Sequence, residues 1–99
     1  MKPIIEPHIH MISRTTDEYM AMRENGIRVC VEPSFWQGAN RRYAGTFFDY
    51  FRLSLEFEHT RAARFGVDHW SAIGMNPKEA EDRKLADEVI DGMGEYLDH

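Results

Sequence analysis

The chain has 99 residues, of which 42% are hydrophobic, and a formal net charge of -5. This composition favours a single small packed domain, residues 1–99, and argues against disorder. The basic residues are scattered among acidic ones, so the sequence shows no electrostatic footprint for nucleic acid or an anionic membrane.

The first predicted element is a short strand over residues 3–10, because Ile4, Ile5 and Ile9 supply β-branched side chains. Only two consecutive aliphatic residues precede Glu6 in this stretch. A signal peptide or a membrane span needs a longer apolar run. The sequence therefore predicts a cytoplasmic location.

A helix over residues 16–25 and a strand over residues 27–33 come next. Glu18 stands three residues after Thr15, which is a capping-box pattern. The run IRVCVEP has little polar alternation, as is typical of a strand buried on both faces of a parallel sheet. Its cysteine, Cys30, is the only one in the chain, which excludes an internal disulfide. We expect it to be a small buried residue in a reducing compartment.

Two further helices flank a third predicted strand. The first is expected to be capped by Thr46, to run to about Phe65 and to end at Gly66. The third strand is predicted in the run VDHWSAIGMNP. The last helix is predicted from apolar residues that repeat every four positions, namely Leu85, Val89, Met93 and Leu97.

The order of strand and helix, repeated three times, predicts an α/β fold with three β/α units around a parallel sheet. Two architectures fit this order. One is a small open α/β sheet. The other is the start of a TIM-type β/α barrel, which is incomplete here because a closed barrel needs about 250 residues.

His8 and His10 are the first candidates for chemistry. Residues i and i+2 of a strand project to the same side, so the two imidazoles are expected to face one cavity. Neutral imidazoles are ligands of divalent metals such as zinc. The alternative is a pair of hydrogen-bonded polar residues near a sheet edge. Glu6 shares a side with His8 and could orient its imidazole, although such residues are more often solvated.

Glu32 closes the second strand as the histidine pair closes the first, and carboxyl ends of parallel strands face one ligand site. We therefore predict it as a third metal ligand. The alternatives are a cap of the strand or an ion pair with Arg41 or Arg42. His69 lies at the beginning of its strand, opposite the expected site, and is interpreted as a core or surface residue.

Four residues are predicted to contact a small-molecule substrate. Asn76 and Lys78 lie at the carboxyl end of the third strand, and Trp36 with Arg42 could line a pocket mouth. The alternatives are a solvated helix start and an aromatic residue that covers the edge of the core. Glu79 is interpreted as part of such a solvated start. No motif for covalent catalysis is visible.

The stretches PIIEPHIHMISRTTDEY, VEPSFW and GMNPKEAED resemble the TatD-related metal-dependent hydrolases of the amidohydrolase superfamily, particularly an EboC-like branch. The resemblance implies a β/α barrel with one or two divalent metals, most commonly zinc, at the carboxyl end of the strands. His8 and His10 match the family's His-x-His motif, which implies that they are metal ligands. Glu32 matches a segment typical of the branch.

The resemblance also implies residues that this chain does not contain. Family members add a bridging carboxylate, two further histidines and a late aspartate that acts as general base. We therefore expect the N-terminal third of a TatD-like hydrolase, truncated or split, in which the catalytic residues are unknown.

Two functions follow as hypotheses. The first is hydrolysis of an ester or amide bond by metal-activated water. The second is a non-catalytic α/β fragment that forms a homo-oligomer or binds a complementary chain at its open sheet edge. A third option is a small stand-alone binding domain with a pocket near Trp36. None of the three requires a membrane, and nucleic acid is disfavoured by the acidic charge balance.

Overall fold

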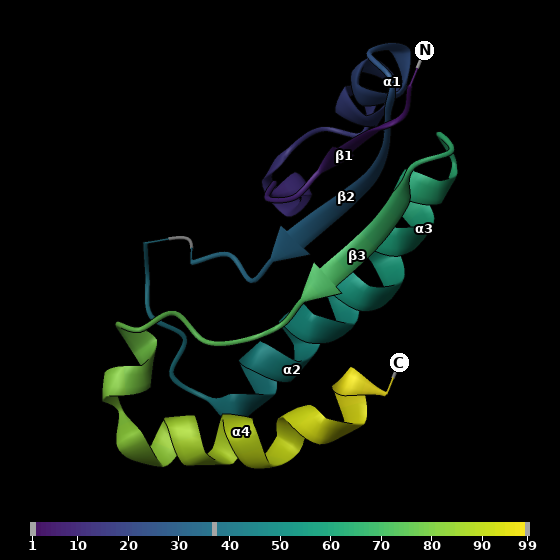
Figure 1. Cartoon of the computed structure of the whole chain (residues 1–99). Coiled ribbons are helices and arrows are strands. Elements are labelled where there is room, and N and C mark those ends of the chain that lie inside the picture. The colour runs from purple at the N-terminus through teal and green to yellow at the C-terminus, as the bar shows by residue number, and fades with distance from the viewer. Residues whose placement is uncertain (1, 37, 99) are drawn as a thin grey trace.

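The structure is a computed structural model that describes residues 2–36 and 38–98 (Figure 1). Strands and helices alternate along the chain, as predicted. The elements in chain order are β1 (Ile4–Glu6), η1 (Met11–Ser13), α1 (Asp17–Glu24), β2 (Ile27–Pro33), α2 (Ala44–Arg52), η2 (Leu53–Glu58), α3 (His59–Ala63), β3 (Asp68–Ala72), η3 (Glu79–Glu81) and α4 (Arg83–Leu97).

The three strands form a parallel sheet in the order β1-β2-β3, and their arrows point the same way in Figure 1. The α/β fold class is confirmed: the chain contains three β/α units, as in an incomplete TIM-type arrangement. Cys30 of β2 pairs with Glu6 of β1 on one side and with His69 of β3 on the other. The side chains of Cys30, Glu32 and His69 therefore lie on the same face of the sheet, because side chains alternate along each strand.

The prediction for the first strand was too long, because β1 ends at Glu6. Pro7 follows and has no backbone N–H to continue a sheet ladder. The Ile9 N–H still donates to the Val31 carbonyl at 3.1 Å, so the chain stays beside β2 after the strand has ended. His8 and His10 consequently lie in an irregular segment rather than in a strand.

The predicted first helix and second strand are confirmed by α1 and β2. Gly26 follows α1 with a φ of 89°, a conformation in which a glycine readily ends a helix. The expected capping box is absent from α1: Thr16 is the N-cap residue without a side-chain cap, and the Glu18 carboxylate accepts from Arg14 instead.

The predicted long helix consists of three consecutive segments, α2, η2 and α3, and ends before Gly66, which has a φ of 72°. Its N-cap residue is Tyr43, three residues before the predicted cap, Thr46. The Thr46 hydroxyl instead donates to the Tyr43 carbonyl at 2.6 Å. The middle segment, η2, is a π-helix, a form found often at functional sites. It carries two buried polar residues, Ser54 and Glu58.

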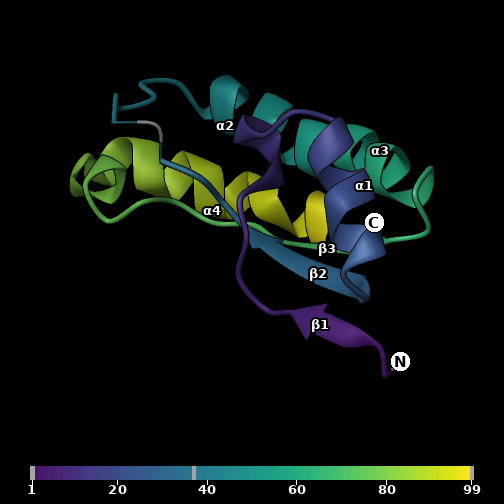
Figure 2. The ribbon, with the colours of Figure 1, turned by 90° about the horizontal axis from the view of Figure 1, so that it is seen from above.

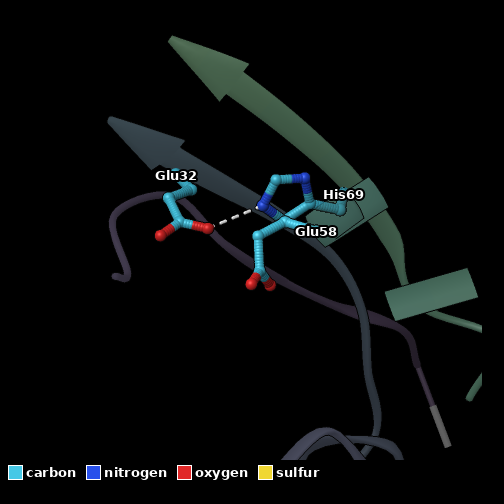
Figure 3. Close-up of side chains that lie close together, drawn as sticks. All are labelled: Glu32, Glu58 and His69. Carbon is cyan, nitrogen blue, oxygen red and sulfur yellow. Dashed lines mark hydrogen bonds and ion pairs between the residues drawn. The ribbon is translucent and has the colours of Figure 1, made fainter. Parts of the chain in front are cut away.

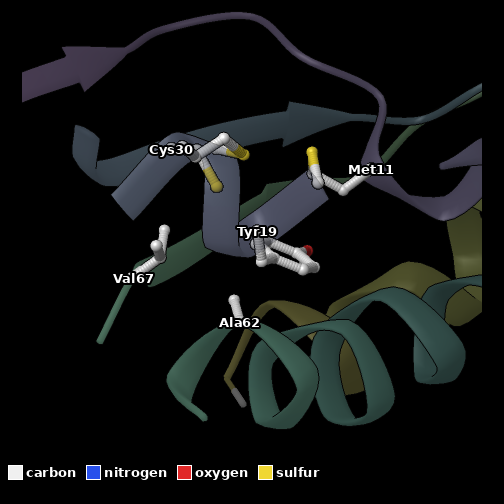
Figure 4. Packing of buried hydrophobic residues seen from close by; sticks show 6 residues of the cluster. Met11, Tyr19, Cys30, Ala62 and Val67 are labelled. Carbon is white, nitrogen blue, oxygen red and sulfur yellow. The ribbon is translucent and has the colours of Figure 1, made fainter. Parts of the chain in front are cut away.

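Helices α1 and α3 lie on the same side of β2 (Figure 2). Between them and the sheet is a cluster that we call the N-terminal core. Figure 4 shows the Tyr19 ring between Ala62 of α3 and Cys30 of β2, with Met11 beside it. The members of the N-terminal core are Met11, Tyr19, Met22, Cys30, Ala62 and Val67. Cys30 is fully buried, and burial is the main cause that raises the pKa of its thiol to about 12, so it remains protonated.

A second cluster, the C-terminal core, joins α2 to α4, which lie side by side at the lower end of Figure 1. Its buried members are Phe47, Tyr50, Phe51, Leu85 and Val89. The predicted stripe of the last helix is confirmed for its first half, whereas Leu97 is 67% exposed. The side chain of Asp82 caps this helix by accepting from the Leu85 N–H at 3.2 Å. No helix in the described part of the chain has both the length and the apolar character that crossing a membrane requires.

Candidate metal centre

The His8 and His10 rings lie together just beyond the carboxyl end of β1. Their centroids are 5.1 Å apart and their planes are nearly perpendicular, at 87°. His8 is exposed and His10 is half-buried. Glu6 contacts the backbone of this segment rather than an imidazole, because its carboxylate accepts from the His8 N–H at 3.3 Å. The two imidazoles are thus neighbours, although the expected strand does not carry them.

The His10 ring is held by a stacking contact with Phe35, with centroids 4.7 Å apart and an angle of 26°. Phe35, which follows β2, is itself fixed. Its N–H donates to the Tyr50 hydroxyl at 2.8 Å, and its carbonyl accepts from Arg41 at 2.9 Å. The Nδ1 atom of His10 is buried and has no hydrogen-bond partner among the described residues. A buried ring nitrogen of this kind is suited to bind a ligand.

Figure 3 shows a second group of potential metal ligands, which come from β2, η2 and β3. Glu32, Glu58 and His69 each offer a ligand atom within 4.8 Å of the others, and all three residues are buried. The His69 Nε2 atom lies 2.7 Å from Glu32 Oε1. Carboxylates and an imidazole at such distances could hold a metal ion. The sequence interpretation had separated His69 from Glu32, but the register of β2 and β3 brings them into contact.

The carboxylates of this group already have strong partners in the protein. The Glu32 Oε2 atom accepts from the Ile12 N–H at 2.9 Å. Glu58 accepts from the Tyr19 hydroxyl at 2.7 Å and from the Arg61 guanidinium at 2.9 Å. Burial and then the hydrogen bond to Glu58 raise the Tyr19 pKa well above its usual range. The Arg61 guanidinium thus already neutralises part of the negative charge of Glu58, which leaves less of that charge to attract a metal cation.

Sequence reasoning missed Tyr19, Glu58 and Arg61, because each contacts residues far away along the chain. The spacing of Glu58 and Arg61, three residues apart on a helix, is a signal for an ion pair. Nothing local indicates that this pair is buried. The prediction of Glu79 as solvated was wrong: it is 2% exposed and accepts from the Arg41 N–H at 2.6 Å and from its guanidinium at 3.3 Å.

The four predicted substrate contacts lie after β2 and β3. Trp36 is 38% exposed and donates to the Asn40 side chain at 3.2 Å. The Asn76 side chain accepts from the Lys78 N–H at 2.9 Å, so these two residues share one turn. Arg42 is exposed and lines a separate hollow near the start of α2. Their roles as substrate contacts stay predictions.

A cavity of about 410 Å³ runs along β3. Among the residues that line it are Leu55, His59, His69, Trp70, Ser71 and Tyr96. His59 is an exposed residue of the long helix, as expected, and its Nδ1 atom lies 3.0 Å from the His69 carbonyl oxygen. The cavity therefore follows the outer edge of the sheet.

A scan against models of known protein families finds none that matches this chain, and a search of curated proteins also finds no match. Among solved structures, the chain is similar to a crystal structure of the TatD-like protein from Archaeoglobus fulgidus, with 30% sequence identity and a TM-score of 0.69. The match covers 75% of this chain and 31% of that protein. The chain thus spans about a third of its neighbour's length. The match supports a relation to TatD-like proteins and an α/β arrangement in common with them.

Proposed function

We propose that His8 and His10 hold a divalent metal, with zinc as the first choice, in a hydrolase related to the TatD-like proteins. The observation that carries this proposal is the histidine pair, with ring centroids 5.1 Å apart and one buried ring nitrogen, His10 Nδ1, that lacks a partner. Leaving a buried polar atom unsatisfied is costly, whereas a neutral imidazole nitrogen is a good zinc ligand.

The residues around the pair are suited to position it. Stacking on Phe35 limits rotation of the His10 ring, and the Glu6 carboxylate holds the His8 backbone. When bound, a divalent cation would activate water and polarise an ester or amide carbonyl. Glu32 as a third ligand stays a prediction. Both of its oxygens already accept hydrogen bonds, and a metal would have to compete with these bonds. The general base is unassigned.

The reaction and its substrate are proposals of the same kind. Trp36, Arg42, Asn76 and Lys78 follow β2 and β3 as the histidine pair follows β1, which supports a role at the same end of the sheet. The match to 31% of the TatD-like neighbour supports a chain that corresponds to part of such a hydrolase. That this part is the N-terminal third, and that the branch is EboC-like, are proposals that rest on the resemblance of the sequence motifs. A cytoplasmic location remains a prediction.

Zinc titration by calorimetry tests the proposal. We expect the wild-type chain to bind Zn²⁺ and the double variant His8→Ala with His10→Ala to lose this binding. Glu58→Gln tests the second ligand group; it keeps an oxygen that can accept from Arg61 and should retain Zn²⁺ binding. If the double variant still bound Zn²⁺ and Glu58→Gln did not, the metal would be assigned to Glu32, Glu58 and His69 instead. Unchanged affinity in both variants would remove both assignments.

A second function is favoured by a different observation. The sheet face opposite the helices is open: Ile5 of β1 and Trp70 of β3 are 63% and 61% exposed. Exposed apolar patches and free strand edges mark sites of association. A non-catalytic role through self-association or a complementary chain fits this face. Light scattering separates the two functions, since a monomer that binds zinc supports the first and an oligomer without zinc binding supports the second.

A further inference from the structure

The turn η1 follows directly after His10, and buried charged side chains hold it from the helical side. The Ile12 N–H donates to Glu32 Oε2 at 2.9 Å. Arg61 donates through Nη2 to the Met11 carbonyl at 2.7 Å and through Nη1 to the Arg14 carbonyl at 3.0 Å. One carboxylate and one guanidinium thus bind the backbone of Met11 and Ile12 in this turn and of Arg14, which directly follows it.

Both of these side chains are themselves fixed. Arg61 is 9% exposed, donates to Glu58 and lies over the Tyr19 ring, with its guanidinium carbon 5.2 Å from the ring centroid. Glu32 is 1% exposed and is 2.7 Å from the His69 imidazole. Hydrogen bonds that involve charged groups are strong when buried. The turn therefore cannot shift without breaking several such bonds.

We infer that Glu32 and Arg61 are positioning residues, which act on the metal site by fixing the turn that follows His10. The expected consequence of this positioning, a change in metal affinity, rests on the proposed function. This positioning gives Glu32 a role through the Ile12 N–H in place of direct ligation, and it accounts for the burial of a charged network beside this turn. Loss of residues that orient metal ligands typically weakens metal affinity about 10- to 100-fold.

Arg61→Lys in the 99-residue chain is the main test. Lysine keeps a positive charge near Glu58, but its compact ammonium cannot reproduce the planar fork that reaches Met11 and Arg14 together. We expect the Kd for Zn²⁺ to rise about 10- to 100-fold at a temperature at which circular dichroism shows the variant to be folded. The absorption spectrum of bound Co²⁺ should keep its shape, because the ligands are unchanged.

Val89→Ala is the matched control for lost stability. Val89 is fully buried in the C-terminal core and belongs to α4. Ile12 of η1 packs against this core, but Val89 makes none of the hydrogen bonds by which Glu32 and Arg61 hold the turn. This variant should unfold at a lower temperature and bind Zn²⁺ with unchanged affinity while folded. If Val89→Ala weakened Zn²⁺ binding as much as Arg61→Lys, the effect would be one of general stability and the inference would be wrong.

Glu32→Gln separates positioning from ligation. The glutamine keeps an oxygen that can accept from the Ile12 N–H, so the inference expects most of the Zn²⁺ affinity and an unchanged Co²⁺ spectrum. Glu32→Ala removes the acceptor and should weaken binding as Arg61→Lys does. A changed Co²⁺ spectrum in Glu32→Gln would show that Glu32 is a ligand and would overturn its positioning role.

A readout without metal keeps this inference distinct from the proposed function. The His10 ring stacks on Phe35, so its ring-proton resonance should carry a ring-current shift in the NMR spectrum. We expect Arg61→Lys to move this resonance by more than Val89→Ala does, although Phe35 itself packs against the C-terminal core. If the wild-type chain fails to bind Zn²⁺, the proposed function fails, and the His10 resonance alone decides whether Arg61 fixes the turn. An unmoved resonance in Arg61→Lys would overturn the inference.

Discussion

The two cores of this protein differ in the residues from which they are formed. The C-terminal core is aromatic and aliphatic, and the Arg41–Glu79 ion pair lies at its margin, with the guanidinium over the Tyr50 ring at 4.7 Å. The N-terminal core adjoins a buried polar network of Tyr19, Glu32, Glu58, Arg61 and His69. Well-packed apolar residues often stabilise a fold as well as or better than a buried ion pair. The polar network is therefore not explained by stability alone, and it contacts the turn after His10, which we infer that it fixes.

Removing Arg61 should have the largest effect on stability. In Arg61→Met the Glu58 carboxylate, which is 1% exposed, would lose its guanidinium partner. Breaking a buried pair in this way costs about 3–5 kcal/mol of the free energy of unfolding. Denaturant unfolding followed by circular dichroism measures the loss.

Arg14→Met is the control for that prediction, since Arg14 forms an exposed ion pair with Glu18. Its removal should change the free energy of unfolding by about 0.5 kcal/mol or less. Equal losses in Arg14→Met and Arg61→Met would show that the polar network contributes no more than a surface pair, and the contrast between the cores would disappear.

Alkaline pH should also weaken the N-terminal core. The folded state raises the pKa of Cys30 from 9.0 to about 12, mainly by burial. The neutral thiol is therefore favoured in the folded state, so its contribution is complete below pH 9 and is lost as the pH rises toward 12. The free energy of unfolding should fall by about 1.4 kcal/mol for each pH unit in this window.

Thermal unfolding between pH 8 and pH 11 checks the prediction, with Cys30→Ala as the comparison. Cys30→Ala should be less stable than the wild type at pH 8. Its stability should begin to fall at a higher pH than that of the wild type, because the ordinary pKa of the remaining buried groups, the tyrosines, is 10.0. The pKa values of Tyr19 and Tyr50 are also raised by burial, so the two cores should both respond above that pH. A Cys30→Ala profile parallel to the wild type would assign the alkaline loss to other groups.

Local patterns in the sequence predicted most of the fold. The β-branched run gave β2 at its observed bounds, 27–33, and Gly26 and Gly66 both follow helix ends with positive φ. The length of β1 was overestimated, although Pro7 was a visible reason for an earlier end. Such patterns predict strand and helix bounds because the interactions that decide these bounds act within a few residues of the chain.

Local sequence patterns could not predict the buried polar network. Tyr19 and Glu58 are 39 residues apart, and Glu32 and His69 are 37 apart. Their contacts depend on the register of β2 with β3 and on which residues of the π-helical segment turn toward the sheet. Glu79 was misjudged for the same reason, because its partner, Arg41, is 38 residues away. The proximity of the His8 and His10 rings could be predicted because only one residue separates them in the sequence.

Gly92→Ala should disturb the C-terminal core. A Cβ atom at Gly92 would overlap the ring of Phe48, which stacks on Tyr96 with centroids 5.5 Å apart. Overpacking of this kind typically costs about 1–3 kcal/mol. Thermal unfolding should show the loss, and Gly92→Ala combined with Phe48→Leu should recover part of it. No recovery in the double variant would show that the ring is not the obstacle.

Gly94→Ala should have the smallest effect, and of opposite sign. Gly94 lies in the same helix, α4, but a Cβ atom there would meet no other atom within 4 Å. Alanine is favoured over glycine inside a helix by up to about 1 kcal/mol, so the variant should unfold at a slightly higher temperature. Because the two glycines differ only in what surrounds them, opposite signs would attribute the Gly92 loss to packing of the C-terminal core. A loss in both variants would instead point to the helix itself, and α4 would then require glycine for its backbone rather than for its contact with Phe48.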